Sequence, residues 1–370
     1  MQIAIIGSGQ LARMLALAGW PQGFSFSFLA EPHENTQSVD GLGKVVIRTN
    51  DLTGIQLYQA LGEPDVVTVE REHVDTVLLN TLKPFCAVYP DPNAIEICQH
   101  RGREKQFLNS LGIHTAPFRL ATTLEQISSA ATTLNFPVFV KTCEDGYDGL
   151  GQWVIRNNLD LNNLLDYLLR QNANLPELVI EGAVNFDREL SLIAVRNSKG
   201  ECAFYPLTEN LHRDGILLSS IAPAKVSKAL QDKAEAMADR ILTAWSYVGI
   251  IAIELFQVGE NLVVNELAPR VHNSGHWTQA ASISSQFSNH LRAITGLGLG
   301  TTKTTDIVGM VNLLGREASK DIVNMDNVQL HLYNKAIRPG RKVGHLNLID
   351  SNRAALESQV NTIREQLYQA

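Results

Sequence analysis

The chain has 370 residues, of which 45% are hydrophobic and 19% charged, and its formal net charge is −7. These values are typical of a globular protein with two or three domains, and they exclude a disordered chain. The acidic balance argues against non-specific nucleic-acid binding, which needs a basic surface. No apolar run approaches the roughly 20 residues that span a bilayer, so we expect no membrane anchor and no signal peptide. The cysteines are widely spaced and fit reduced thiols of a cytoplasmic protein: Cys86, Cys98, Cys143 and Cys202.

Strands and helices alternate in residues 1–100, which predicts an α/β domain with a Rossmann-like parallel sheet. Expected strands cover residues 3–6, 24–29, 45–47 and 66–69. The first helix carries Leu11, Met14, Leu15 and Ala18 on one face.

A glycine loop, Gly7-Ser-Gly-Gln-Leu-Ala12, joins the first strand to this helix and matches the G-x-G-x-x-A dinucleotide fingerprint. Free backbone amides in such a loop hold phosphate. Glu31 ends the second strand, where the fingerprint expects an acid for a ribose. A glycine turn required for geometry alone, or a mononucleotide phosphate, explains the pattern equally well. On this feature alone, a nicotinamide-dependent oxidoreductase is a rival.

Residues 101–184 read as a small α+β subdomain. Helices are expected near 103–111 and 124–134, and strands at 115–120, 138–141 and 152–155. The loop from Asp145 to Gln152 contains three glycines, so its amides can close over a polyphosphate whose charge Lys141 balances. The alternative is a flexible hairpin with a surface lysine. The run 178–184 reads as a hinge strand whose unpaired backbone groups suit an adenine edge, with Glu189 placed for ribose hydroxyls.

Residues 185–370 are dominated by hydrophobic strands, which predicts an antiparallel sheet. One helix carries Leu230, Ala234, Met237 and Ile241 in phase, with Ser227 as its N-cap. A closing helix carries Leu356, Val360, Ile363 and Leu367.

Two strands of this sheet, 249–256 and 262–266, form an expected hairpin. If the loop is 259–261, Glu254 faces Glu266, while Val258 pairs with Leu262 and Phe256 with Val264. Opposed carboxylates destabilise a sheet unless a divalent cation lies between them, and oxygen ligands favour magnesium shared with a nucleotide. The alternative is a different register in which Glu254 reaches solvent.

Two further segments concentrate polar groups. The stretch from Asn265 to His276 contains a carboxylate, a guanidinium and two imidazoles, and within it Arg270 and His272 form an anion-binding set. Near the end of the chain, basic side chains cluster around a Pro-Gly turn: Lys335, Arg338, Arg341, Lys342 and His345. A solvated basic loop is the commoner explanation of such a run, but the set of Arg270 and His272 favours a small anionic substrate shared by both clusters.

With these residues in view, the chain resembles the 5-(carboxyamino)imidazole ribonucleotide synthases, a purine-biosynthetic family of the ATP-grasp superfamily. The likeness runs over nearly all 370 residues and rests on 7–14, 70–72, 146–149, 205–207, 210–212, 265–276 and 338–345. It implies the ATP-grasp fold, with lid subdomain 101–184 and C-terminal domain 185–370, and a homodimer. The implied reaction joins bicarbonate to aminoimidazole ribonucleotide while ATP is converted to ADP, through carboxyphosphate.

The resemblance also implies residue roles. Magnesium would be held by Glu254 and Glu266, and bicarbonate and the intermediate by Arg270, His272 and Lys335. The amine proton would pass to His272 or to the phosphate of the intermediate. The implied ATP contacts are Arg101, Lys141, Gly146, Tyr147, Asp148, Gly149, Leu150, Gly151, Gln152, Glu181, Gly182, Ala183, Val184, Glu189, His212, Asn265 and Glu266. The implied ribonucleotide contacts are Gly9, Gln10, Leu11, Glu70, Glu72, Tyr147, Asp148, Arg338, Arg341 and Lys342.

Three positions depart from the family pattern. Asp145 replaces a glycine and Leu150 a basic residue, so one positive charge is missing from the loop, and Ala12 replaces a glycine. Another ATP-grasp ligase, such as a formate-dependent transformylase or a biotin carboxylase relative, is a rival. So is a catalytically silent nucleotide-binding module.

Overall fold

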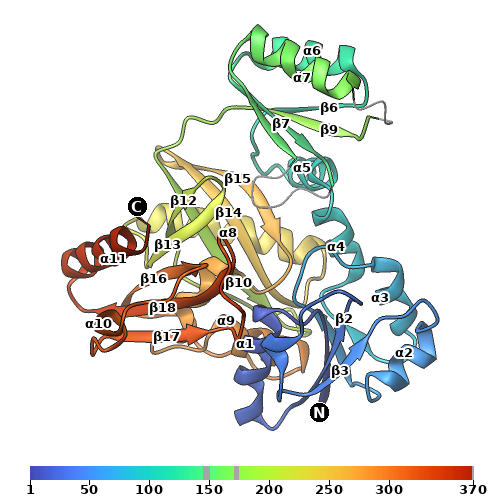
Figure 1. The fold of residues 1–370 in the computed structure, drawn as a ribbon, viewed down its shortest axis with the longest axis vertical. Coiled ribbons are helices and arrows are strands. Elements are labelled where there is room, and N and C mark those ends of the chain that lie inside the picture. Colours follow the sequence, from blue (N-terminus) through green and yellow to red (C-terminus); the bar gives the residue numbers. More distant parts are fainter. Residues whose placement is uncertain (145–150, 171–174, 369–370) are drawn as a thin grey trace.

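The computed structural model describes residues 1–144, 151–170 and 175–368. These residues form three sheets, which Figure 1 shows as three lobes around a common centre. None of the described helices is both long and apolar enough to cross a bilayer.

The first sheet, here the N-terminal sheet, has the order β3-β2-β1-β4-β5, and its strands are parallel as predicted. The sequence did not predict β5 or the helices α2 to α4. The elements are β1 (Gln2–Ile6), α1 (Gln10–Gly19), β2 (Ser25–Ala30), β3 (Lys44–Ile47), α2 (Gly54–Ala60), β4 (Val66–Val69), α3 (Thr76–Leu82), β5 (Ala87–Val88) and α4 (Pro92–Cys98).

The second sheet, the lid sheet, is antiparallel with the order β6-β9-β7-β8. The strand predicted at 115–120 is wrong at its start, because β6 begins at Phe118. Residues before it instead contact the edge of the third sheet, where Val264 donates to the carbonyl of His114 at 2.8 Å. The elements are α5 (Arg101–Ser110), β6 (Phe118–Ala121), α6 (Leu124–Leu134), β7 (Val138–Thr142), β8 (Gln152–Ile155), α7 (Asn158–Arg170) and β9 (Leu178–Gly182).

The third sheet, the large sheet, is antiparallel with nine strands in the described residues, as the C-terminal pattern predicted. The Ser227 hydroxyl caps α8 by accepting from the amide of Leu230, which confirms the predicted N-cap. The elements are β10 (Arg188–Arg196), β11 (Cys202–Phe204), β12 (Thr208–Arg213), β13 (Ile216–Ala222), α8 (Lys228–Ala244), β14 (Gly249–Val258), β15 (Asn261–Ala268), η3 (Asn273–Gln279), α9 (Gln286–Ile294), β16 (Ile307–Leu314), α10 (Lys320–Val323), β17 (Val328–Leu332), β18 (Lys342–Asp350) and α11 (Arg353–Tyr368).

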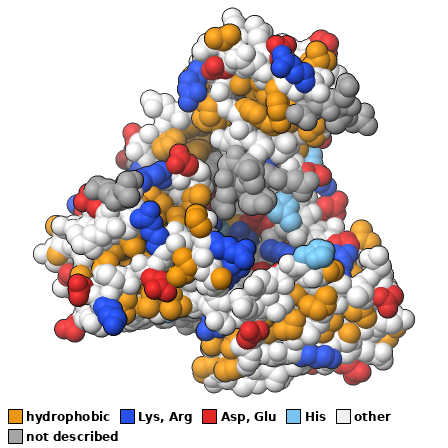
Figure 2. Space-filling model, in the orientation of Figure 1, with side chains coloured by type: hydrophobic (Ala, Val, Ile, Leu, Met, Phe, Trp, Pro, Cys, Tyr) orange, Lys and Arg blue, Asp and Glu red, His pale blue; other side chains and the backbone are white. Residues whose placement is uncertain are grey.

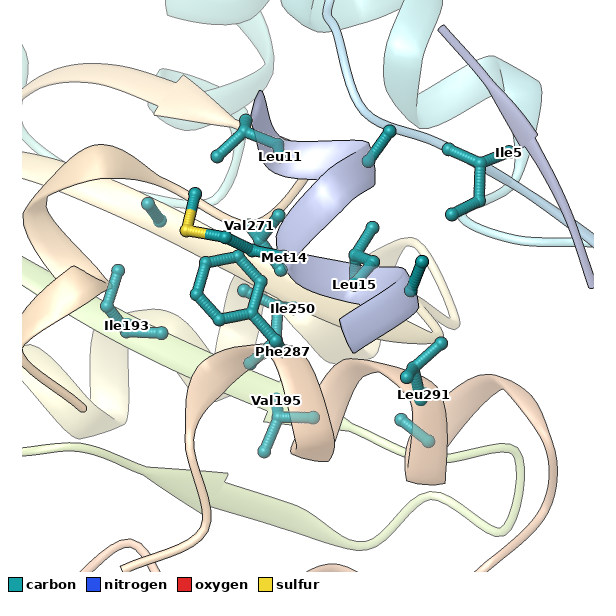
Figure 3. Packing of buried hydrophobic residues seen from close by; sticks show 14 of the residues in the cluster. Ile5, Leu11, Met14, Leu15, Ile193, Val195, Ile250, Val271, Phe287 and Leu291 are labelled. Atoms are coloured by element: carbon teal, nitrogen blue, oxygen red, sulfur yellow. The ribbon is translucent and has the colours of Figure 1, made fainter. Parts of the chain in front are cut away.

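The N-terminal and large sheets share one hydrophobic core. Figure 3 shows Met14 and Leu15 of α1 packed against Phe287 and Leu291 of α9, above strands of the large sheet. Glycine is also required at the end of α1, where a Cβ on Gly19 would lie 2.4 Å from the ring of Phe26 in β2. The lid sheet has a separate core under α6 and α7.

Candidate active site

A cavity of about 620 Å³ lies between the large sheet, the lid sheet and the segment after β4. Figure 2 shows Lys, Arg and His side chains gathered around this central hollow. Most of its lining was predicted from the sequence, although Asp214, Gly215, Leu217 and Asn273 were not assigned. The lining residues are Glu72, Arg101, Lys141, Gln152, Glu189, His212, Asp214, Gly215, Leu217, Glu254, Asn265, Glu266, Arg270, His272, Asn273 and Lys342.

The predicted carboxylate pair is present, because Glu254 of β14 faces Glu266 of β15. The turn and the pairings that lead to this register differ from the prediction. Val258 pairs with Asn261, so the turn is one residue shorter than expected, and the Val258–Leu262 and Phe256–Val264 pairings are wrong. A bulge beside Glu254 inserts one residue in β15 and restores the pairing of the two glutamates. Asn265 lies in this bulge, and its Nδ2 donates to Glu254 Oε2 at 3.4 Å.

Both carboxylates of the pair have a raised pKa. Burial and the charge of Glu266 raise the pKa of Glu254 to about 7. The pKa of Glu266 is also raised, because protein surrounds it and Glu72 repels it, although its side chain is exposed to the cavity. A divalent cation would remove this repulsion, and the donors at hand are oxygens, which suit magnesium.

Another group of metal-ligand type lies nearby at the start of α5. Ligand atoms of His100, Cys143 and Glu177 lie within 4.8 Å of one another. The imidazole is already satisfied, however: its Nδ1 accepts from the amide of Arg103, and its Nε2 lies 3.1 Å from Glu177 Oε2. Nothing in this group requires an ion.

Arg270 and His272 lie on the wall beside the carboxylates. Arg270 pairs with Glu72 at 2.6 Å, so two residues predicted for different ligands are in contact. His272 Nδ1 accepts from the amide of Ser274 at 3.3 Å, and Nε2 lies 3.7 Å from Glu254 Oε1. Burial and the charge of Arg270 hold the pKa of His272 well below its usual value, so the ring is neutral. Its proton then lies on Nε2, which makes His272 a hydrogen-bond donor to the cavity.

A buried ion triplet lies at the boundary of the lid sheet and α5. Glu181 binds Lys105 at 2.8 Å and Lys141 at 2.7 Å. Although burial opposes it, the two lysines lower the pKa of Glu181 to about 2. Lys105 was missed in the sequence, because adjacent charged residues in a helix do not reveal which one turns inward. The same holds for Glu104, which accepts from the amide of Leu267 at 3.2 Å beside the carboxylate pair.

Glu189 and His212, both predicted to contact ATP, contact each other at 2.6 Å across β10 and β12. Burial lowers the pKa of His212, but the hydrogen bond to Glu189 and the charge of Glu254 raise it overall. This pair extends the acidic row formed by the glutamates of β14 and β15.

The predicted hinge 181–184 is only partly available for a ligand. β9 lies between β6 and β7, and the amides of Gly182 and Ala183 donate to the carbonyls of Pro117 and Pro137. The prediction of unpaired backbone groups is therefore wrong at these two positions. Ala183 and Val184 line a separate groove beside the turn of β14 and β15.

The amides of Gly7, Ser8 and Gly9 in the first glycine loop are not free, contrary to the prediction, and Gly7 donates to the carbonyl of Leu29. Gly9 donates to Glu70 Oε1 at 3.1 Å, and Ser8 donates to Glu34 Oε1 at 2.9 Å. A Cβ on Gly7 would lie 2.4 Å from Glu70 Cγ, so glycine is required by this close approach. Carboxylates of the protein thus take the places that a dinucleotide phosphate would occupy.

Of the neighbouring residues predicted to contact substrates, some lie in a polar cluster and one is buried in a hydrophobic core. Gln10 and Lys335 are hydrogen-bonded to each other, and Lys335 also lies near Glu70, whereas Leu11 is buried in the shared core. Glu31, expected at a ribose, instead pairs with Arg48 at 3.2 Å.

The basic residues of the C-terminal cluster lie in different environments. Lys342 lines the cavity, while Arg338 is exposed on the adjoining turn, where the Arg341 amide donates to its carbonyl. His345 is fully buried and accepts at Nδ1 from Tyr333 or donates to it at 2.6 Å. Burial keeps the pKa of His345 well below its usual value, so it adds no positive charge.

The predicted residues Gly146, Tyr147, Asp148, Gly149 and Leu150 lie outside the described residues, as does Asp145. At the end of this loop, Gly151 has a φ of +68°, a conformation that favours glycine. The next residue, Gln152, lines the cavity.

Comparisons with protein families cover almost the whole chain. Residues 1–99 match the ribonucleotide synthetase preATP-grasp domain, residues 106–287 match the ATP-grasp domain, and residues 309–359 match the phosphoribosylaminoimidazole carboxylase C-terminal domain.

Individual relatives agree with these matches. The N5-carboxyaminoimidazole ribonucleotide synthase of Pseudomonas aeruginosa is 40% identical over 97% of this chain and 98% of the relative. The synthetase structure from Thermus thermophilus is 42% identical, with a TM-score of 0.91, and covers 100% of this chain and 99% of that one. A structure from Aspergillus clavatus, in complex with ADP and 5-aminoimidazole ribonucleotide, is 26% identical with a TM-score of 0.87 and covers 99% and 98%.

Proposed function

Because the chain belongs to the N5-carboxyaminoimidazole ribonucleotide synthases, ATP-dependent ligases of the ATP-grasp family, we propose that bicarbonate is the carboxyl donor at this cavity. The chain is an ADP-forming ligase of purine biosynthesis that carboxylates 5-aminoimidazole ribonucleotide.

The observation that carries the proposal is the opposed pair Glu254 and Glu266. Two ionised carboxylates facing each other in a sheet need a counter-charge, and after burial the charge of Glu266 is the largest cause that raises the pKa of Glu254. We assign magnesium to this pair, with Asn265 beside it. The ion would neutralise phosphate charge on the nucleotide and on the developing intermediate.

We assign the nucleotide to the lid side of the cavity. Within the described part of the chain, Lys141 Nζ donates a hydrogen bond to Glu181 alone, so its other two donors can bind phosphate oxygens. Arg101 and Gln152 line the same wall, and the Glu189–His212 pair lies further along the large sheet. The residues from Gly146 to Leu150 and the hinge residues Ala183 and Val184 stay proposals by resemblance.

Arg270 and His272 are assigned to bicarbonate and the intermediate. Bicarbonate is a weak nucleophile attacking a polyanion, so its barrier falls mainly through positioning and charge neutralisation. Glu72 holds the Arg270 guanidinium at 2.6 Å and so fixes its orientation. His272 presents an N–H, which leaves the phosphate of the intermediate as the acceptor of the amine proton. Closure of the lid sheet would exclude water from carboxyphosphate.

We assign the ribonucleotide end to the side where the N-terminal sheet meets the C-terminal basic turn. Lys335 lies there with Gln10 and Glu70 rather than in the lining of the cavity. Arg338, Arg341 and Lys342 supply positive charge for the ribonucleotide phosphate. Division at residues 100 and 184, a homodimer and a cytoplasmic location are also proposed by resemblance.

The test is ADP release with each substrate omitted in turn. Release should require ATP, magnesium, bicarbonate and the aminoimidazole ribonucleotide together, and formate should not replace bicarbonate. Glu266→Gln should abolish magnesium-dependent turnover. Formate-dependent release would assign the chain to another ATP-grasp reaction, and full activity of Glu266→Gln would remove the metal assignment.

A further inference from the structure

The side chain of Gln286, at the start of α9, holds both backbone groups of His272. Its Oε1 accepts from the amide of His272 at 2.9 Å, and its Nε2 donates to the carbonyl of the same residue at 2.6 Å. Nε2 also lies 3.2 Å from Nδ1 of His276, and the backbone amide of Gln286 donates to the hydroxyl of Thr278. Both polar atoms of this fully buried carboxamide are therefore engaged by the segment that follows β15.

The carboxamide fits this place in one orientation. If it were rotated by half a turn, its NH2 group would face the N–H of His272 and its oxygen would face the carbonyl, so two attractive contacts would become repulsive. The space is also closed from the side of η3, because a Cβ on Gly275 would lie 2.6 Å from Oε1 of Gln286. The two hydrogen bonds thus fix the backbone of His272 relative to α9.

The position of this backbone decides where the imidazole of His272 lies. His272 is the N-cap of η3, and its Nδ1 accepts from the amide of Ser274 at 3.3 Å. Its Nε2 lies 3.7 Å from Oε1 of Glu254, at the wall of the cavity. Few rotatable bonds separate the ring from the backbone that Gln286 holds. A shift of that backbone therefore moves the N–H that His272 presents to the cavity.

We propose that Gln286 is a positioning residue, which acts through His272 to keep the carboxylated intermediate in place until the amine attacks. Gln286 is fully buried and does not line the cavity, so it touches no substrate. Without its two hydrogen bonds, the His272 N–H would hold the intermediate less well, and water would cleave more of it to bicarbonate and phosphate. ATP would then be consumed without carboxylation of the amine. This inference rests on the proposed function, which assigns His272 to the intermediate.

The test is Gln286→Met, a side chain of similar length and volume that cannot bind the backbone of His272. Its Tm should fall, because a buried amide and a buried carbonyl lose their partners. Its KM for ATP and its Tm shift with ADP and magnesium should be unchanged. A misplacement of about 1 Å can cost about a hundredfold in rate, so kcat/KM for the ribonucleotide should fall roughly ten- to a hundredfold, with more ADP formed per carbamate.

Asn289→Leu is the matched control, because Asn289 lies one turn further along α9 and holds a backbone in the same manner. Its Oδ1 accepts from the amide of Gly300 at 2.8 Å, and its Nδ2 donates to the carbonyl of Gly300 at 3.2 Å. Asn289 is also fully buried and does not line the cavity. Asn289→Leu should lower the Tm and leave the ADP formed per carbamate unchanged. The same value of this ratio in Asn289→Leu and Gln286→Met would overturn the proposal.

Gly275→Ala decides the question if Gln286→Met does not fold. It keeps Gln286 but places a Cβ against its carboxamide, so the ADP formed per carbamate should rise, and a wild-type ratio would overturn the proposal.

A double-mutant cycle tests whether the effect passes through His272. In protein that carries His272→Asn, adding Gln286→Met or Gly275→Ala should not raise the ADP formed per carbamate further, because the ring that Gln286 positions is gone. An additive rise would overturn the proposal. Failure of the proposed function would appear separately, as wild-type protein that forms no carbamate, or as His272→Asn with a wild-type ratio.

Discussion

Replacing Glu254 with glutamine should stabilise the protein in the absence of magnesium. Burial and the facing Glu266 raise the pKa of Glu254 from 4.5 to about 7, so the metal-free fold favours the protonated form. Glu254 therefore does not lower the free energy of unfolding below about pH 4.5. Its destabilising effect grows as the pH rises towards 7 and stays constant above it. Because one pH unit corresponds to about 1.4 kcal/mol, the penalty above pH 7 is about 3 kcal/mol. Removing it should raise the Tm by about 4 °C for a chain of this length.

The assay is thermal unfolding of wild type and Glu254→Gln at pH 5 and pH 8, with EDTA or with magnesium and ADP. The Tm of the variant should exceed that of wild type most at pH 8 with EDTA and only slightly at pH 5. Magnesium with ADP should raise the Tm of the variant less than that of wild type. Glu365→Gln on the exposed face of α11 is the control, since it removes the same charge without relieving an opposed carboxylate. An equal gain at both pH values, or no gain, would refute the reasoning about the carboxylate pair.

Three further outcomes are expected. Glu181→Gln leaves the charges of Lys105 and Lys141 without their partner and should cost about 3 to 5 kcal/mol in urea unfolding. Because the pKa of Glu181 is lowered to about 2, the wild-type advantage over this variant should persist above pH 4.5 and shrink as the pH falls towards 2; equal stabilities at pH 7 would contradict it. Arg338→Ala should raise the KM for the ribonucleotide while the KM for ATP is unchanged. A change in the KM for ATP alone would contradict the assignment of Arg338 to the ribonucleotide phosphate. Ser227→Ala should lower the free energy of unfolding by about 1 kcal/mol with no effect on kcat, because it removes only the cap of α8.

The sequence predicted the sheets better than the contacts between them. Alternation of strands and helices, and the apolar faces of α1, α8 and α11, depend on local periodicity and are therefore visible in one chain. The facing of Glu254 and Glu266 was confirmed only because a shorter turn and a bulge cancel, and a bulge has no simple pattern in the sequence. The carboxylate of Glu70 under the first glycine loop was not predictable, because its chain position is 61 residues away. Asn273 lies within a polar stretch that the sequence singled out, but only the packing of η3 shows that it lines the cavity.

The separate core beneath α6 and α7 has consequences for movement of the lid sheet and for proteolysis of the segment that leaves it. The chain enters this part past the bridge between Thr115 and Val264, and it leaves before the amide of Asp187 bonds to Gln257. Among the described residues, the hydrophobic cluster of the lid sheet shares no residue with the clusters of the N-terminal and large sheets, whereas polar contacts such as Glu181–Lys105 join the lid sheet to α5. A swing of the lid sheet therefore has to break these polar contacts, and it opens neither neighbouring core. A protease that cuts near residues 183–186 should therefore leave the cores of the N-terminal and large sheets folded.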